Sequence, residues 1–246
     1  MVTIIDVLLP SFGDTPLNLI DAQAVEFWKS QRLSRVAPAT VAKELRAFKA
    51  MIKRSVIWGV IAAHPFQYVA APQEVSSKPA SYYTREQMKS LYKVKSPYVW
   101  HWKLFANTGM RRAEGQNLKI EEVLTDRIRV ISTAEGRTKS RRWREIPINR
   151  AAREALDALI GSRKEGYVLP RIDGRSLTRA FDRDRKRAKL DGNLHRLRHT
   201  FISHLVMDGW PLRRVQVIAG HANYSTTEKY AHMAPDALRG FEGFEI

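Results

Sequence analysis

Apolar residues recur at helical spacing through the first 75 positions, which predicts helices there. One helix is expected after Asp21, whose side chain can cap a first turn, and another near Pro38, because proline suits a first turn. Gly59 is a suitable terminator for this second helix. Its apolar positions follow an i, i+4, i+7 pattern and are Val41, Leu45, Phe48, Ile52 and Val56. Residues 1–75 are therefore predicted to form a helical unit.

The pattern changes near residue 76. Residues 71–81 contain two prolines, three serines and only one large apolar residue, which is typical of a linker between domains. Thr84 and Gln87 then have the form of a capping box, which opens a new helix. We therefore place a linker at residues 76–83 and a second unit at residues 84–246.

The second unit is predicted to mix helices with one hairpin. Residues 127–131 and 142–148 are short β-rich runs, separated by a polar stretch that contains a glycine. The rest of the unit is interpreted as helix and loop. The predicted fold class is therefore mainly α with a small antiparallel β-sheet (α+β).

One predicted helix in this unit places polar side chains beside its buried face. Its apolar stripe consists of Leu194, Leu197, Phe201 and Leu205. His195 and Arg198 each lie one position after a stripe residue, so the two share a face next to the core. Taken alone, this pair is more typical of a capping histidine and a surface arginine.

Charge adds a partner to this picture. The 246 residues include 42 Lys and Arg against 25 Asp and Glu, a formal net charge of +17, so a polyanion is the first partner to consider. Residues 1–75 hold 8 basic and 6 acidic residues, which leaves most of the excess in the rest of the chain. With 44% hydrophobic residues, the chain has enough apolar material for one or two packed cores.

Composition also excludes several classes of protein. The absence of cysteine excludes disulfides, thiolate nucleophiles and Cys-ligated metal sites. No apolar run approaches the ~20 residues that span a bilayer and no signal-peptide pattern is present, so we expect a cytosolic protein without a membrane partner. Phosphate-loop, HExxH and GxSxG motifs are missing. Asp182 and Asp184 have cationic neighbours that favour ion pairing on a helix surface, so neither a metal ion nor another cofactor is expected.

Basic residues occupy the other faces of the helix after Pro38, at Lys43, Arg46, Lys49 and Lys53. A solvated surface is the favoured interpretation of this segment alone, and a face that contacts DNA phosphates is the alternative. Arg142 and Arg144, in the second β-rich run, are further candidates for DNA contact.

One tyrosine and a set of polar residues form a chemically coherent group. Cleaving a phosphodiester without a metal ion needs a nucleophile, cationic donors for the pentavalent phosphorane and an acid for the leaving alkoxide. The candidates are Arg111, Glu114, Lys139, His195, Arg198, His221 and Tyr230.

The order and spacing of these residues resemble the tyrosine recombinases of the phage-integrase family. The matching motifs are Thr-Gly-Met-Arg at 108–111 with an acidic residue three positions later, His-Arg-Leu-Arg-His-Thr at 195–200, and Gly-His at 220–221 followed by a tyrosine nine positions after the histidine. Residues 9–17 and 37–41 resemble the helical core-binding domain of integrases. The resemblance covers most of the chain. It implies a core-binding (SAM-like) domain and a catalytic domain that form a C-shaped clamp around DNA.

The resemblance also implies a role for each candidate. Tyr230 would attack the scissile phosphate to give a 3′-phosphotyrosyl link and a free 5′-hydroxyl. Arg111 and Arg198 would clamp the non-bridging oxygens, and Lys139 would protonate the 5′-oxygen. Because free tyrosine has a pKa of ~10, the cationic surroundings are expected to make its oxygen a usable nucleophile.

Three further residues have supporting roles by the same resemblance. His195 would assist proton transfer, His221 would donate a hydrogen bond to the phosphate, and Glu114 would orient its neighbours. Residues 225–228 have the form of a capping box, which predicts that Tyr230 lies in an early turn of a new helix.

The resemblance implies a site-specific DNA recombinase that acts on duplex DNA with a specific core site. Four protomers are expected on two paired duplexes, with a monomer or weak oligomer in the absence of DNA. The expected location is the cytosol of a bacterial, archaeal or phage-infected cell. Two alternatives are a type IB topoisomerase-like enzyme and a DNA-binding remnant that no longer exchanges strands.

Overall fold

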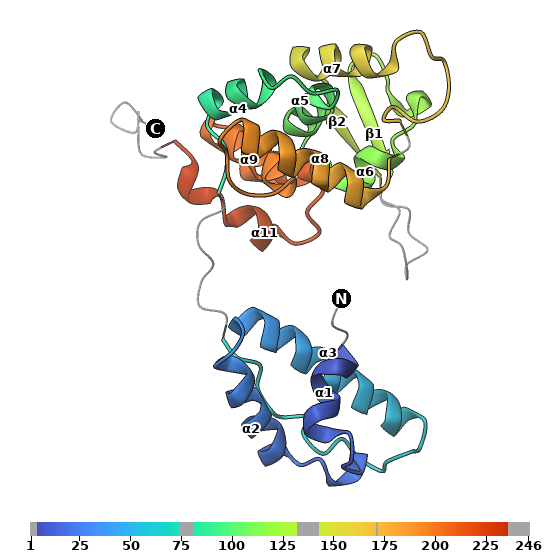
Figure 1. The fold of residues 1–246 in the computed structure, drawn as a ribbon, viewed down its shortest axis with the longest axis vertical. Helices are drawn as coiled ribbons and strands as arrows, with labels where there is room; N and C mark the ends of the chain where they lie inside the picture. Colours follow the sequence, from blue (N-terminus) through green and yellow to red (C-terminus); the bar gives the residue numbers. More distant parts are fainter. Residues whose placement is uncertain (1–3, 74–80, 132–142, 171, 236–246) are drawn as a thin grey trace, which may run out of the picture. The chain divides into compact units, whose positions relative to one another are not determined.

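The computed structural model describes residues 4–73, 81–131, 143–170 and 172–235 and divides the chain into two compact units, Met1–Ser77 and Lys78–Ile246 (Figure 1). The first unit is helical. Its elements are α1 (Ile4–Phe12), the 3₁₀ turn η1 (Leu17–Leu19), α2 (Ala22–Leu33) and α3 (Pro38–Ile57).

The second unit is mostly helical as well, with one two-stranded sheet. Its elements are α4 (Arg85–Tyr92), α5 (Val99–Thr108), α6 (Arg112–Asn117), η2 (Ile120–Glu122), β1 (Arg127–Ile131), β2 (Trp143–Pro147), α7 (Arg150–Ile160), α8 (Gly174–Arg187), α9 (His195–Met207), α10 (Leu212–Ala219), α11 (Tyr224–Glu228) and η3 (Ala231–Met233). The fold class predicted from the sequence, mainly α with a small antiparallel sheet, is confirmed.

Local signals set the helix boundaries of the first unit. The Asp21 side chain accepts a hydrogen bond from the Ala24 amide at 2.8 Å and caps α2, and Pro38 occupies the first turn of α3. After α3 the chain turns at Gly59, where φ is 72°. The apolar stripe of α3 packs against α1, α2 and the segment after α3, and its buried members are Val41, Leu45, Phe48 and Ile52. These boundary predictions are confirmed.

The core of the second unit is built around α5, which packs against α7 and α9. The two strands of the predicted hairpin pair antiparallel, with Val130 opposite Arg144 and Ile131 opposite Trp143. At the start of the unit, Thr84 and Gln87 make the expected capping box of α4. No helix in the described ranges is long and apolar enough to cross a bilayer.

The second unit begins before residue 84. The Tyr83 ring is fully buried in its core, its hydroxyl donates to the Asp191 carbonyl, and its amide donates to the Thr200 hydroxyl at 3.0 Å. Tyr83 is therefore not part of the linker in which the sequence analysis places it. Proline and serine around it obscured an aromatic residue that tertiary packing recruits.

Asp184 is a core residue and not a surface one: it makes the expected i+3 ion pair, with Arg187 at 3.9 Å, but its side chain is fully buried. Residues 177, 181 and 184 share the buried face of α8 at i, i+4, i+7 spacing. The Asp184 carboxylate accepts hydrogen bonds from the Trp102 indole at 2.9 Å and the Ser96 hydroxyl at 2.5 Å. Asp182, two positions earlier, pairs with Arg185 at 2.9 Å on the helix surface, as expected.

The two aspartates of α8 give a matched pair of variants. Asp184→Ala leaves the buried Trp102 and Ser96 donors without an acceptor, so we expect it to lower the free energy of unfolding by about 1–3 kcal/mol. Asp182→Ala removes only a half-buried pair at the helix surface and should cost less than about 1 kcal/mol. Urea unfolding followed by tryptophan fluorescence measures both, and equal effects would contradict the role assigned to Asp184.

Candidate active site

Two helices end at glycines, and a backbone carbonyl at each of these helix ends accepts a hydrogen bond from the same buried arginine. Gly109 follows α5 with φ of 61°, and Gly220 follows α10 with φ of 71°; both lie in the left-handed region that favours glycine. The Arg198 guanidinium donates to the Gly109 carbonyl at 2.7 Å and to the Ala219 carbonyl at 2.6 Å. The negative ends of both helix dipoles therefore stabilise a cation that is only 3% exposed.

Besides its positive φ, close packing against α9 also favours glycine at position 109. A Cβ atom at this position would lie 2.3 Å from Cδ1 of Phe201, which belongs to the apolar stripe of α9. Since Arg198 is on the same helix, this close approach brings its guanidinium within reach of the end of α5.

Arg111 is the second arginine of the site and precedes α6. Its amide donates to Glu114 Oε2 at 2.7 Å, and its Nη1 donates to Glu114 Oε1 at 2.9 Å. Its Nη2 donates to the Gly220 carbonyl at 3.1 Å. The Arg111 side chain is 43% exposed, so part of the guanidinium still faces solvent.

Arg144, a candidate for DNA contact, lies largely buried beside Arg111 and lines the same pocket. Its Nη1 and Nη2 each donate to a Glu114 oxygen at 2.9 Å, and its Nε donates to the Ile218 carbonyl at 2.8 Å. The side chain is 9% exposed because β2 directs it inward towards α10. Hydrogen bonds from Arg144 and Arg111, together with their charges, hold the pKa of Glu114 down at about 2 although burial opposes the shift.

Beside these groups is a pocket of 450 Å³, and its lining includes Arg111, Arg144, Gly220 and His221. His221 Nδ1 is 2.8 Å from the Thr227 hydroxyl, which fixes the ring. Burial and the nearby charges of Arg198 and Arg111 lower the pKa of His221 to about 4, so the ring is neutral at pH 7. Burial also lowers the pKa of Arg198 to about 10, with a further contribution from Arg111.

A pair of histidines on α9 connects the arginines to the tyrosine. His195 and His199 lie one turn apart with ring centroids at 4.8 Å, and the Tyr230 hydroxyl hydrogen-bonds to His199 Nδ1. The pKa of His195 is lowered, first by burial, and that of His199 falls to about 4 for the same main reason. A neutral His199 accepts this hydrogen bond from the phenol when its ring proton is on Nε2. His199 was assigned no role from the sequence motifs, although its i+4 spacing from His195 was a usable signal.

Tyr230 is placed differently from its prediction. The short helix α11 begins after Asn223 and ends at Glu228, and Tyr230 follows it as the residue before η3. The ring is buried against residues of α9 and α10, and burial raises its pKa to about 12, opposed only in part by Arg198. In the protein without DNA, desolvation therefore outweighs the effect of the nearby cation on the phenol, and activation of the phenol in the complex with DNA stays a prediction.

Most of the predicted residues meet in this one cluster: Arg111, Glu114, His195, Arg198, His221 and Tyr230. Lys139 and Arg142 lie outside the described residues. Among the described residues, no group of three His, Asp or Glu side chains is arranged to hold a metal ion.

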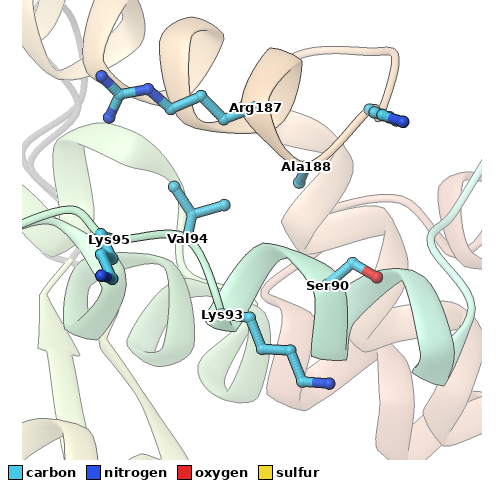
Figure 2. A pocket seen from close by; sticks show the side chains of 7 residues that line it. Ser90, Lys93, Val94, Lys95, Arg187 and Ala188 are labelled. Atoms are coloured by element: carbon cyan, nitrogen blue, oxygen red, sulfur yellow. The ribbon is translucent and has the colours of Figure 1, made fainter.

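Two other basic surfaces lie outside this cluster. On α3, Lys43, Arg46 and Lys53 are exposed and Lys49 is half-buried with its ammonium on the Gln67 carbonyl. In the second unit, a pocket of 580 Å³ is lined by Lys93, Lys95, Arg187 and Lys189, and Figure 2 shows Arg187 on one side of it with Lys93 and Lys95 on the other. This pocket shares no lining residue with the pocket beside Arg111.

Known proteins resemble this chain in sequence and in fold. The integrase of Escherichia phage P2 is 25% identical over 224 residues, which cover 87% of this chain and 61% of the phage protein. Tyrosine recombinase XerC of Bacillus licheniformis is 30% identical over 226 residues, covering 81% of this chain and 72% of XerC. The Tn1549 transposon integrase, solved with circular intermediate DNA, shares the fold at 19% identity, with a TM-score of 0.73 over 97% of this chain and 90% of that one.

The family assignment rests on the second unit. Residues 82–236 match the model of the phage integrase family, and this span contains α4 to η3 with every described member of the arginine, histidine and tyrosine cluster. The match covers more than half of the chain, and it agrees with the resemblance seen in the sequence motifs. The chain belongs to the phage integrase family.

Proposed function

We propose that this protein is a site-specific recombinase that cleaves and rejoins duplex DNA through a 3′-phosphotyrosyl intermediate, without a metal ion or ATP. The observation on which this depends is the pair of guanidinium groups anchored at the ends of α5 and α10 beside Tyr230. Arg111 and Arg198 each use two side-chain hydrogen bonds on groups of the described residues, and a guanidinium has five N–H donors. The remaining donors can bind the non-bridging oxygens of one phosphate.

The proposed reaction exchanges one phosphoester bond for another. The Tyr230 oxygen attacks phosphorus, the bond from phosphorus to the 5′-oxygen breaks, and Lys139 gives that oxygen a proton. The phenol proton leaves through the imidazole pair, in which His199 already contacts the hydroxyl and His195 lies edge-on beside it. Attack by another 5′-hydroxyl reverses these steps and releases Tyr230.

The raised pKa of Tyr230 makes activation depend on DNA. A phenol with a pKa of about 12 is protonated at neutral pH, so the protein without DNA holds its nucleophile in an unreactive form. A phosphate that binds to Arg111 and Arg198 would place the attacked atom beside them. The tyrosine must then exchange its contact with His199 for one with the phosphate.

Basic surfaces outside the cluster would hold the flanking duplex. We propose that the exposed cations of α3 and the four cations around the pocket of Figure 2 contact backbone phosphates, which makes binding salt-dependent. A clamp of the two units around a specific core site, and four protomers on two paired duplexes, complete the proposal.

Replacing the nucleophile tests the chemistry directly. Tyr230→Phe should bind DNA but form no covalent protein–DNA adduct on a nicked suicide substrate, because no oxygen remains to attack phosphorus. Tyr224→Phe is the control, since Tyr224 is a partly exposed tyrosine of α11, and its adduct should form as in the wild type. Adducts are measured by denaturing gel electrophoresis.

The same assay separates the alternatives. An adduct that persists in Tyr230→Phe would contradict the assignment of the nucleophile. Relaxation of supercoils without strand exchange would support a topoisomerase-like activity, and binding without any cleavage by the wild type would support a DNA-binding remnant.

Binding of a phosphate should be linked to proton uptake. The pKa values of His195 and His221 are lowered in the free protein, first by burial and then by the charges of Arg198 and Arg111. An anion bound to these arginines counters their charge and raises both pKa values towards the ordinary ~6.5. The complex then holds more protons than the free protein at pH values between about 4 and 6.5, so affinity should rise as the pH falls through this window.

Calorimetry measures this linkage at pH 6 in buffers of different ionisation enthalpy. The binding enthalpy should vary with the buffer, and His221→Asn should reduce the variation. His232→Asn is the control, because His232 is exposed on η3 and lies outside the cluster. A binding enthalpy that is the same in every buffer would contradict the proposed approach of a phosphate to these histidines.

A further inference from the structure

We propose that Arg144 is a positioning residue for Arg111: it occupies half of the Glu114 carboxylate and thereby keeps the charge of Arg111 available to the DNA phosphate. This inference rests on the proposed recombinase function. It assigns to a buried arginine of β2 a part in the chemistry of an arginine that precedes α6.

The hydrogen bonds around Glu114 are shared equally. The carboxylate accepts two from Arg111, through the amide at 2.7 Å and Nη1 at 2.9 Å, and two from Arg144, through Nη1 and Nη2 at 2.9 Å each. An ionised carboxylate has about four lone-pair sites. All of them are therefore in use, and each arginine holds two.

The two arginines differ in what they leave free. The side chain of Arg144 is 9% exposed, and its third hydrogen bond goes to the Ile218 carbonyl at 2.8 Å, so three of its five N–H donors bond to protein groups, against two side-chain hydrogen bonds for Arg111. Arg111, Arg144 and His221 line the same pocket, but the side chain of Arg111 is 43% exposed. Arg144 is thus placed to hold the carboxylate, while Arg111 is placed to reach a ligand.

The charge balance around Glu114 explains why a second arginine is needed. Glu114 is 7% exposed, and a buried carboxylate needs a cationic partner with good geometry. Without Arg144, Arg111 would be its only cation among the described groups that bond to it. The two would form a closed, neutral pair that draws Arg111 away from the phosphate. With Arg144 present, the carboxylate is already neutralised, and the positive charge of Arg111 stays in excess.

The fold reserves space for Arg144. A Cβ atom on Gly220 would lie 2.8 Å from Cδ of Arg144 and 2.9 Å from its Nε, so the missing side chain at position 220 leaves room for the arginine stem. The Gly220 carbonyl also accepts from Arg111. The glycine therefore serves both arginines, and β2 is joined through Arg144 to the end of α10.

The test is Arg144→Gln in single-turnover cleavage of a suicide substrate. Adduct formation should slow by about 10- to 100-fold, as is usual when a residue that orients a functional group is lost. On a substrate with a methylphosphonate at the scissile position, one non-bridging oxygen is replaced by methyl and less charge develops for Arg111 to stabilise. The rate ratio between wild type and variant should shrink there. A purely structural defect would slow both substrates equally and would overturn the proposal.

A second variant tests the sign of the charge effect. Glu114→Gln combined with Arg144→Gln removes the carboxylate that would otherwise neutralise Arg111, so the double variant should cleave faster than Arg144→Gln alone. A double variant as slow as the single variant, or slower, contradicts the inference. Arg144→Lys, which retains the charge, should be intermediate, and it replaces Arg144→Gln if that variant does not fold. Arg129→Gln, at an exposed arginine of β1, is the control.

The outcomes also separate this inference from the proposed function. If the wild type forms no adduct that depends on Tyr230, the recombinase function is wrong and the role of Arg144 falls with it. If the wild type cleaves through Tyr230 and Arg144→Gln cleaves at the same rate, the function stands and only the role of Arg144 is wrong.

Discussion

The hydrogen bonds from Arg198 to the ends of α5 and α10 are the interaction on which the site depends. A buried guanidinium is costly unless its donors are satisfied, and the last carbonyls of a helix are costly unless something binds them. Gly109 and Gly220 turn the chain so that the carbonyls of Gly109 and Ala219 accept hydrogen bonds from Arg198, which satisfies the donors and the acceptors together. The same turn after α10 presents the Gly220 carbonyl to Arg111. Two arginines are thereby held by backbone, which is a stiffer support than side chains on loops.

This support concentrates positive charge where little negative charge compensates it. Glu114 is the carboxylate that bonds to Arg111 and Arg144, and Arg198 relies on carbonyl dipoles instead. The nearby histidines respond by remaining neutral, as their lowered pKa values show. An anion bound here would reduce the repulsion among these cations, which supports the proposed binding of a DNA phosphate.

The sequence predicted what depends on local chemistry and missed what depends on tertiary packing. The caps at Asp21 and Thr84 follow from short-range hydrogen bonds, and motif spacing singled out Arg198 and Tyr230, which the fold brings close together. In contrast, Asp184 lies in a run of charged residues that looks solvent-exposed, and only the Trp102 donor from another helix explains its burial.

Two more residues show why the geometry of the site was harder to predict than the residues that form it. Arg144 was one of several arginines near the hairpin, and nothing in that run distinguishes the one that turns inward to Glu114. The pKa of Tyr230 reflects burial against α9 and α10, which no spacing of motifs encodes. Patterns identify residue types, whereas burial and exact hydrogen-bond partners come from the folded chain.

Tyr230 belongs to the small apolar cluster of Ile202, Val206, Val215 and Ala219 as much as it belongs to the chemistry. If Tyr230 is the proposed nucleophile, its place in the core links the local stability of the segment after α11 to the rate of cleavage. Each 1.4 kcal/mol by which packing favours the buried ring reduces the population with a reoriented ring about tenfold. Substitutions in this cluster that weaken the packing of the ring would therefore lower the stability of the protein and raise the rate of cleavage. Hydrogen exchange in this segment would report the population with a reoriented ring.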